Sequence, residues 1–547
     1  MKKALTGLLA LSICLGILSG CAASSKSSTP DSSSSQGGEV KSNGVTAVGT
    51  YPIVEEPLTL SIMGRKDPGA PNWDELEVFK RLTNITGISF DFEMAETETF
   101  AEQKNIALVG GEYAGMIWRD DTAAITDEET YGPQGIFIDL TDLIEEYAPN
   151  LKKLLADRPD VKAAITAMDG SIYGLPYVFD TATTQGHTGF FDEQWMKNVG
   201  IDKVPETTDE LYAMLKAFKE QDANGNGDPN DEIPMTTTGM TTTMRDLLIP
   251  AFTGLPDGLS FNVDNGDIVY APATAKYKDF LVFAHKLYSE GLLDAEFSTQ
   301  TSQQWQAKVK GGLCGVYSAS PTLMDPATTT TQQLSLPPLT SENNSVKSVR
   351  RPYNLYPGRA FITDKCENPV AAIRLLDMFY ATPDNAVEGF SGQTTFLGFE
   401  NEHWQYTDST KEAYEWIAPI TGFGDINKSI SVNMELPGYL SFLAMPSGNP
   451  LMDMKVEQVK TMQKPYYKDA YPVNARFTED ESERGNVYEN DIYSYVVMMS
   501  TKFITGEEST DNFDQYLATL DKMGLQDLLQ IKRDAYDRYK ANLTSAN

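Results

Sequence analysis

The chain has 547 residues, of which 41% are hydrophobic and 10% aromatic, so it is long enough for several domains or two large lobes with ordinary cores. Its 44 basic residues against 77 acidic ones give a net charge of −33, which argues against nucleic acid as a partner because binding to phosphate depends on Lys and Arg. Three His residues in the whole chain are poor material for a His-rich metal site or for most acid–base catalysis.

The N-terminus has the features of a secretory signal. Lys2 and Lys3 precede an apolar run that ends near Leu18, and this run is too short for a permanent membrane span. The Leu-Ser-Gly-Cys sequence that ends at Cys21 resembles the cleavage box of lipoprotein signals. This resemblance implies that residues 1–20 are removed and that Cys21 carries a lipid anchor with palmitate. We therefore expect the protein at the extracellular face of the cytoplasmic membrane. The alternative is an ordinary leader with an accidental Cys.

A segment rich in Ser, Gly and Thr follows the signal, from residue 21 to about residue 50. Its composition cannot bury enough apolar surface to fold, so we expect a flexible tether. No later stretch has the roughly 18 consecutive apolar residues of a transmembrane helix. The mature chain keeps Cys314 and Cys366 besides Cys21, and the sequence does not decide whether these two pair.

The folded part alternates between strand-like and helix-like segments. Leu58–Met63 predicts a strand, Trp73–Leu82 has the apolar period of a helix, and Ile88–Phe92 alternates like a second strand. A polar helix near 96–109 and a short buried strand at Ala114–Trp118 follow. This alternation predicts the α/β class, with mostly parallel sheets that helices cover on both faces.

Two later helices have clear N-terminal signals. Thr207 and Glu210 have the spacing of a capping box, in which each side chain satisfies a free backbone N–H group. Asn368 followed by Pro369 fits the N-cap and first turn of another helix.

The strongest chemical motif is a calcium loop that directly follows the helix starting after Thr207. Oxygen-bearing side chains stand at loop positions one, three and five, and a Gly at position six permits the sharp turn, as in the start of an EF-hand. Position twelve is Ile233, so an acidic residue just before it must supply the last carboxylate. The alternative is a plain Asn-Gly turn. The predicted ligands of a structural Ca²⁺ are Asp222, Asn224, Asn226, Asp228, Asp231 and Glu232.

No catalytic motif is as specific as this loop. The chain contains no Walker A sequence, no His-Glu-x-x-His, no Cys-x-x-Cys and no Gly-x-Ser-x-Gly. A glycosidase pair is defined by the distance between two carboxylates, so the sequence alone does not decide for or against one.

Six stretches, in this order along the chain, are similar to those of a known family: Thr141–Leu155, Asp169–Pro176, Phe191–Phe218, the loop through Pro234, Asn368–Tyr380 and Phe503–Tyr539. They resemble the extracellular solute-binding proteins, family 1, of carbohydrate ABC importers, in particular the lipoprotein branch that includes oligosaccharide binders. The resemblance implies a two-lobed fold of the periplasmic-binding-protein kind, type II-like, with a ligand in the cleft between the lobes. It also implies a structural calcium in the loop at Asp222.

On this resemblance, the N-terminal lobe combines residues 51–178 with 355–420, and the C-terminal lobe combines 179–354 with 421–547. The calcium loop then lies in the C-terminal lobe. One departure from the family concerns Gly110–Gly115, which replaces the acidic, Pro-containing stretch common before the third strand. Because that stretch borders the cleft, the departure indicates a ligand different from those of well-known members.

Five residues are candidates for ligand binding, because sugars bind to aromatic faces and to hydrogen-bonding side chains in a concave cleft. Trp118 ends a short strand, at the carboxyl-end position where α/β proteins bind ligands, although core packing would explain it equally well. Tyr177 and Tyr353 stand near the expected connections between the lobes, and Tyr317 follows a strand-like segment. Arg351 fits an acidic sugar, but pairing with a surface carboxylate is commoner.

The sequence therefore predicts a monomeric, lipid-anchored binding protein that captures an oligosaccharide and delivers it to the membrane subunits of an ABC permease without catalysis. Three alternatives stay open: a secreted glycoside hydrolase, a surface adhesion or scaffold module that docks through the calcium loop, and the same binding fold with a peptide or another small polar solute. The sequence does not identify the solute.

Overall fold

The computed structural model describes residues 44–546, apart from 121–123, 182–188, 229, 242, 318–332, 433–435 and 448–455. The predicted signal, Cys21 and most of the predicted tether lie outside these residues. In the part of the chain that is described, no helix combines the length and the apolar character needed to cross a bilayer.

The end of the predicted tether belongs to the folded body, which corrects the boundary at residue 50. The Thr46 N–H group donates a hydrogen bond of 2.9 Å to the Ile53 carbonyl oxygen, and Val45 bridges to Val54. The buried Arg374 guanidinium donates to the carbonyl oxygens of Thr46 and Thr50. The sequence of residues 45–50 gives no sign of this attachment, because the segment is polar and is held by its backbone carbonyl groups.

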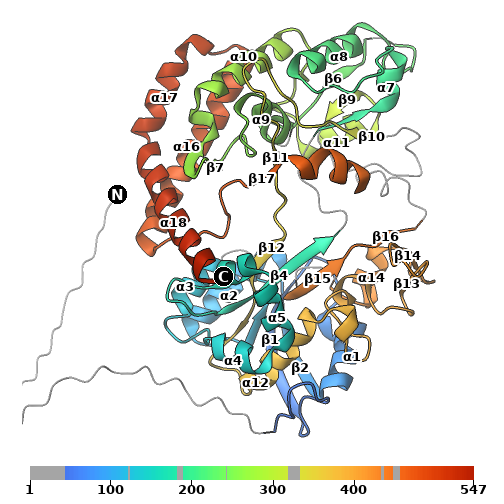
Figure 1. Cartoon of the computed structure of the whole chain (residues 1–547), viewed down its shortest axis with the longest axis vertical. Helices are drawn as coiled ribbons and strands as arrows, with labels where there is room; N and C mark the ends of the chain where they lie inside the picture. Colours follow the sequence, from blue (N-terminus) through green and yellow to red (C-terminus); the bar gives the residue numbers. More distant parts are fainter. Residues whose placement is uncertain are drawn as a thin grey trace, which may run out of the picture. The chain divides into compact units, whose positions relative to one another are not determined.

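The first sheet has six strands in the order β15-β4-β12-β3-β1-β2 (Figure 1). The strand pairs of this sheet are parallel except those of β12, which runs antiparallel to both β3 and β4. The strands are β1 (Leu58–Lys66), β2 (Ile88–Glu96), β3 (Met116–Trp118), β4 (Gly174–Thr181), β12 (Leu355–Ile362) and β15 (Gly438–Phe442). The predicted first, second and third strands are confirmed.

Helices pack on this sheet and share one hydrophobic core with it. Asn368 caps its helix as predicted, because its side chain accepts a hydrogen bond of 3.1 Å from the Ala371 N–H group. The helices of this part are α1 (Glu77–Thr86), α2 (Thr97–Gly110), α3 (Ala124–Tyr131), α4 (Thr141–Tyr147), α5 (Pro149–Asp157), α6 (Pro159–Ile165) and α12 (Pro369–Asp377).

The second sheet has four strands in the order β10-β5-β9-β6, and only the β9–β6 pair is parallel. This corrects the prediction that each lobe has a mostly parallel sheet. β5 is the first strand after the chain leaves the first sheet, and it runs opposite to both of its neighbours. The strands are β5 (Phe190–Asp192), β6 (Ile233–Met235), β9 (Cys314–Tyr317) and β10 (Gln333–Ser335).

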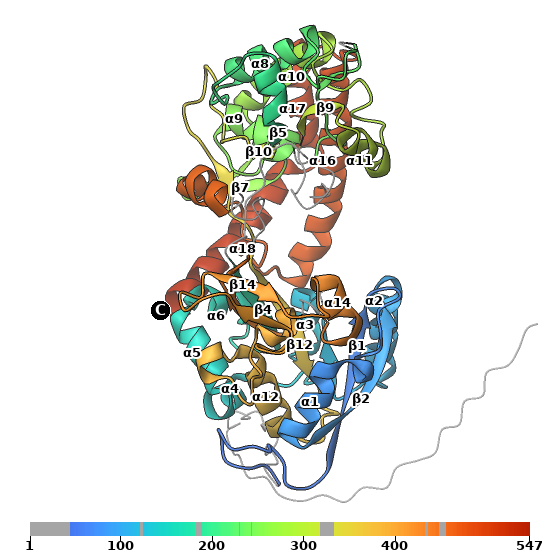
Figure 2. The ribbon, with the colours of Figure 1, turned by 90° about the vertical axis from the view of Figure 1, so that its right-hand side faces the viewer.

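A separate hydrophobic core accompanies the second sheet. Thr207 caps α8 as predicted, but Glu210 accepts from the Glu206 N–H group rather than from Thr207, so the capping box is not closed. The surrounding elements (Figure 2) are α7 (Glu193–Asn198), α8 (Thr208–Glu220), α9 (Ile249–Thr253), the hairpin β7 (Phe261–Asp264) and β8 (Asp267–Tyr270), α10 (Ala275–Ser289) and α11 (Ser302–Lys310). Two cores and two sheets of mixed α/β type confirm the predicted fold class.

The segment after residue 420 divides between the two cores, unlike the predicted boundary. β15 pairs with β4, and Leu440 and Phe442 pack with Tyr177, so the first sheet extends to this part of the chain. Beside it lie α13 (Thr394–Leu397), α14 (Phe423–Ser429) and a three-stranded sheet of β13 (Trp404–Tyr406), β14 (Ala413–Trp416) and β16 (Met445–Pro446).

The chain passes between the two sheets three times. β4 is followed by β5, β12 brings the chain back, and after β16 the chain runs to the C-terminal helices, which pack into the second core through residues such as Val496 and Phe503. α18 also contacts α6 beside the first sheet. The C-terminal elements are β17 (Tyr467–Lys468), paired with β11 (Val349–Arg350), then α16 (Glu479–Thr505), α17 (Phe513–Lys522) and α18 (Leu525–Ala546).

The two cysteines left open by the sequence belong to different cores. Cys314 lies on β9 in the second sheet, and Cys366 packs against the first core. Both are free and buried, so they do not pair with each other.

Replacing Trp118 tests how much its packing stabilises the first core. Its side chain has no exposed surface and contacts Phe379 edge-on, with 5.6 Å between ring centroids. Trp118→Ala should lower the free energy of unfolding by about 3–5 kcal/mol, because the substitution leaves a large cavity. Urea denaturation measures this. The half-buried Trp416 is a matched control, and its Ala variant should lose clearly less. A loss below about 1 kcal/mol for Trp118→Ala would contradict a packing role.

Candidate functional site

An aromatic cluster lies where β4 and β12 pair, on the strands that lead out of and back into the first sheet. We define it as Tyr177, Phe179, Tyr353 and Tyr356. The rings of Tyr177, Phe179 and Tyr356 are nearly parallel, with interplanar angles of 11–20° and centroids 5.6–6.4 Å apart. Tyr353 meets Tyr356 edge-on at 5.1 Å. Tyr177 is buried, whereas the other three are half-buried and keep part of their surface exposed.

Strand geometry explains why these rings gather. Tyr177 and Phe179 are two residues apart on β4 and therefore point to the same face of the sheet. Tyr356 is the partner of Tyr177 across the β4–β12 ladder. The register then shifts before Ala360, where Gly358 has a φ of 64°. Such a bulge bends the strand and redirects the side chains on either side of it.

Three buried arginines lie near this cluster: Arg359 on β12 contacts it, while Arg65 stands at the end of β1 and Arg119 directly follows β3. Arg359 lies just after the bulge, and its guanidinium is 4.8 Å from the Tyr356 ring centroid. Its carbonyl oxygen accepts a hydrogen bond of 2.7 Å from the N–H group of Arg119, which has a φ of 61°. Arg119 also donates to the Arg65 carbonyl oxygen and pairs with Asp67 at 3.1 Å. The carboxyl end of parallel strands is the usual place for ligands in α/β sheets.

A second polar group surrounds Asp180 on β4. Its carboxylate accepts hydrogen bonds from Arg158 at 3.0 Å, from Asn354 at 2.8 Å and from the Tyr439 hydroxyl at 3.3 Å. Asp180 is one residue beyond Phe179 and so points to the other face of the strand. Burial raises the pKa of Tyr353 above its ordinary value, so its hydroxyl stays protonated and able to donate. This end of β4 and β12 therefore carries the aromatic cluster on one face and the polar group around Asp180 on the other.

The structure brings two of the five predicted ligand residues, Tyr177 and Tyr353, into this cluster. Trp118 packs in the first core, and Tyr317 is 2% exposed on β9, against Phe190 of the second sheet. Arg351 is exposed and pairs with Asp469, which is the commoner alternative that the sequence left open.

Sequence reasoning missed Phe179, Tyr356, Arg359 and Asp180. The alternation of aromatic residues at Tyr177 and Phe179 was a usable signal, because it places both rings on one face of a strand. The pairing of Tyr356 with Tyr177 was not, because it depends on register across a separation of more than 170 residues.

The predicted calcium loop is held by its own side chains. Asp222 Oδ2 accepts from the Gly227 N–H group at 2.9 Å, and Glu232 Oε1 accepts from the Ala223 N–H group at 3.0 Å. Asp231 accepts from the side-chain amides of Asn224 and Asn226, at 2.9 and 2.7 Å. The Asp228 carboxylate bonds to Asn230 instead.

The donor chemistry of this loop fits a hard cation. Asp222 Oδ1 and Glu232 Oε2 are buried and have no hydrogen-bond donor among the described residues. A buried carboxylate oxygen without a partner is costly, and a cation would satisfy it. Within the described ranges, no three His, Cys, Asp or Glu side chains converge tightly enough to hold a metal ion, so the predicted six ligands are not assembled into one sphere.

Comparison with known proteins shows similarity along nearly the whole chain. No family model matches. The fructooligosaccharide ABC transporter substrate-binding protein FusA of Streptococcus pneumoniae is 26% identical over 551 residues, which cover 97% of each chain. The lipoprotein LipO of Bacillus subtilis is 29% identical over 262 residues, which cover 46% of this chain and 47% of LipO.

Solved structures agree with the fold described above. FusA as an EF-hand mutant in complex with fructo-nystose has a TM-score of 0.70 and 24% identity, covering 88% of this chain and 100% of FusA. An extracellular solute-binding protein of Bifidobacterium longum subsp. infantis has a TM-score of 0.76 and 23% identity, covering 90% of this chain and all of the other. In sequence and fold, the chain is thus similar to the substrate-binding proteins of carbohydrate ABC importers, which confirms the resemblance that its sequence predicts.

Proposed function

We propose that this protein captures an oligosaccharide outside the cell and delivers it, chemically unchanged, to an ABC permease. The aromatic cluster on β4 and β12 is the observation that carries this proposal, because it lies on two of the connections between the cores. FusA and the Bifidobacterium protein are named as substrate-binding and solute-binding proteins, which favours binding over the hydrolase alternative.

The surface around the cluster suits a sugar chain. The apolar faces of sugar rings stack on aromatic side chains, and their hydroxyl groups need hydrogen-bonding partners at the edges. Phe179 and Tyr356 supply half-buried ring surface, and the hydroxyl group of Tyr353 supplies a hydrogen-bond donor within the same cluster. A ligand that touches both lobes stabilises the arrangement in which they approach each other, so binding shifts the population toward a closed state.

The proposed place of work is the outer face of the cytoplasmic membrane. The lipoprotein-like box at Cys21 supports a lipid anchor, and one of the relatives is itself named a lipoprotein. A tether of small polar residues between Cys21 and the body would let a monomer reach its permease.

We also propose that the loop from Asp222 to Glu232 binds a structural Ca²⁺. The buried, donor-free oxygens of Asp222 and Glu232 support this, as does the EF-hand that the FusA structure names. A cation there would hold the start and the end of the loop together, between α8 and β6. In that state Asp231 would exchange its two amide donors for the ion.

Replacing Tyr356 tests the sugar platform. Tyr356→Ala should weaken the binding of the glycan that the wild-type chain prefers by about tenfold, because a stacked aromatic ring contributes about 1 kcal/mol beyond its buried area. Isothermal titration with a panel of fructooligosaccharides, neutral glucans, oligogalacturonides and peptides measures this. The oligogalacturonides are included because three arginines adjoin the cluster.

Tyr212→Ala is the matched control, because Tyr212 lies on α8 in the second lobe, hydrogen-bonded to Glu290. It should bind the glycan like the wild type. If the chain binds peptides and none of the glycans, the ligand is a peptide and the proposal of a sugar ligand is wrong. Shorter glycans after incubation would show hydrolysis instead of capture.

Removing calcium tests the loop. EDTA should lower the melting temperature of the wild-type chain by roughly 5 °C, and added Ca²⁺ should restore it, because a bound ion stabilises only the folded state. Asp222→Asn should abolish the response, since it takes one buried carboxylate from the loop. Differential scanning calorimetry measures both.

Asp408→Asn is the control, because Asp408 also caps a turn through its carboxylate but lies outside the calcium loop. This variant should keep the full response to Ca²⁺. If EDTA leaves the wild-type melting temperature unchanged and titration with Ca²⁺ releases no heat, the proposal of a bound calcium ion is contradicted.

A further inference from the structure

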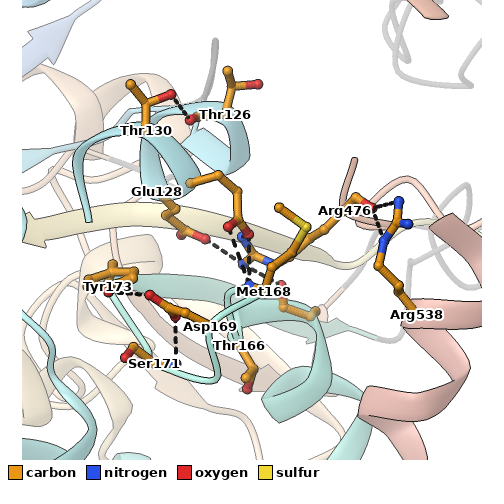
Figure 3. Close-up of polar contacts among 12 residues, drawn as sticks. Thr126, Glu128, Thr130, Thr166, Met168, Asp169, Ser171, Tyr173, Arg476 and Arg538 are labelled. Atoms are coloured by element: carbon orange, nitrogen blue, oxygen red, sulfur yellow. Dashed lines mark hydrogen bonds and ion pairs between the residues drawn. The ribbon is translucent and has the colours of Figure 1, made fainter. Parts of the chain in front are cut away.

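Arg476 lies on the last connection between the two cores, on the stretch between β17 and α16. Its side chain is 4% exposed although it belongs to neither sheet. The guanidinium binds two neighbouring carboxylates on α3, those of Glu128 and of Glu129, the second at 2.7 Å (Figure 3). It also donates to the Ala164 carbonyl oxygen of α6 at 3.2 Å. One buried side chain thus fastens the connection to two helices of the first lobe.

The backbone of Arg476 is held from the other side. Its carbonyl oxygen accepts two hydrogen bonds from Arg538 of α18, at 3.0 and 3.3 Å (Figure 3). Arg538 pairs with Glu481, which closes the capping box of α16 by accepting from the Thr478 N–H group at 2.8 Å. The side chain of Arg476 therefore contacts helices of the first lobe, whereas its carbonyl oxygen is hydrogen-bonded to α18, one of the helices that pack into the second core.

α3 connects this fastening to the strand ends beside the aromatic cluster. Asp127 of α3 pairs with the buried Lys104 of α2. Lys104 also pairs with Asp120, which follows Arg119 after β3. Glu128 packs closely against Gly174, the first residue of β4. A Cβ atom at Gly174 would lie 2.3 Å from Glu128 Oε1. The same short helix thus lies against the start of β4 and Arg476, and it is linked to Asp120 after β3 through Lys104.

The junction also leaves room for movement. A cavity of about 130 Å³ lies beside Arg476 and Arg538, with Ala163 of α6 and Tyr539 of α18 in its wall. A less tightly packed contact between lobes permits a change of angle at a lower cost than a close-packed one.

We propose that Arg476 is a positioning residue for ligand capture: its grip on Glu128 and Glu129 fixes the last connection to α3 and sets the angle from which the two lobes close. This rests on the proposed function, since it concerns how the two cores meet around a ligand. Arg suits the position because its planar group presents N–H donors in fixed directions to two carboxylates and a carbonyl oxygen, whereas Lys offers a single point charge.

Glu128 makes the grip sensitive to protons. It is fully buried, and burial raises its pKa to about 7. The charged groups nearest to the Glu128 carboxyl group are Arg476 on the connection and Asp127 and Glu129 on its own helix. Arg538, Glu481 and Lys104 are more distant, because they reach Glu128 only through these neighbours. A carboxyl group whose pKa is raised by folding stabilises the folded state most below its unfolded pKa, near 4.5. That contribution is lost as the pH rises through about 7.

The test compares Arg476→Gln and Glu128→Gln with Arg484→Gln, an exposed control on α16 that pairs with Asp480. For Arg476→Gln we expect a glycan dissociation constant about tenfold higher at a temperature where circular dichroism shows a fully folded chain. Arg484→Gln should bind like the wild type. A purely structural role would lower the melting temperature of Arg476→Gln and leave its affinity unchanged, which would overturn the proposal.

A second measurement needs no glycan and so separates this proposal from the proposed function. The wild-type melting temperature should fall more steeply between pH 5 and pH 8 than that of Glu128→Gln, whose amide mimics the protonated acid. Hydrogen exchange at 474–478 and in α3 should rise in Arg476→Lys, which keeps the charge if Arg476→Gln fails to fold. Unchanged exchange in Arg476→Lys would contradict the grip whether or not a glycan binds, and identical pH profiles for wild type and Glu128→Gln would contradict the raised pKa of Glu128.

Discussion

In each sheet, the strand that enters from the other sheet runs against its neighbours, and the rest of the structure depends on this constraint. β12 returns from the second core and takes its place between β3 and β4, antiparallel to both. β5 does the same in the second sheet, between β10 and β9. A connection thus ends in the middle of a sheet, so side chains on it come to lie beside the strand ends where α/β proteins bind their ligands.

The aromatic cluster follows from that placement. Tyr356 faces Tyr177 because β12 pairs with β4, and the bulge at Gly358 then brings Arg359 against the Tyr356 ring. Neither strand makes such a surface alone: β4 supplies two rings in alternation, β12 supplies Tyr356 in antiparallel register, and Tyr353 stands just before β12. Because both strands are also connections between the cores, a ligand on these rings touches the parts of the chain that must bend when the lobes approach.

Two buried ion-pair clusters lie around α3 of this very acidic chain. Lys104 and Arg476 are nearly inaccessible and each holds two carboxylates, all within or beside α3. Breaking such a pair by removing one partner is costly, because an uncompensated charge is left inside the protein. Buried pairs therefore fix orientation more than they add stability, which suits positions where one part of the fold must be held at a set angle to another.

The sequence was informative wherever structure is local. The alternating pattern at Ile88–Phe92 and the Asn368–Pro369 start of α12 were read correctly, because a strand face and a helix cap depend on neighbouring residues. Trp118 was ambiguous for the same reason, since a short apolar strand predicts its burial and its place at a strand end equally well. The antiparallel course of β12 and the pairing of β15 with β4 could not be read, because they depend on contacts across long separations and very short strands.

Small-angle X-ray scattering of the ligand-free and glycan-saturated chain tests the central claim most directly. Two separate cores joined by three connections should approach each other around the ligand, so the radius of gyration should fall at saturation, and the glycan should be recovered intact. An unchanged radius of gyration at a concentration where titration shows full binding would contradict capture by closure of two lobes.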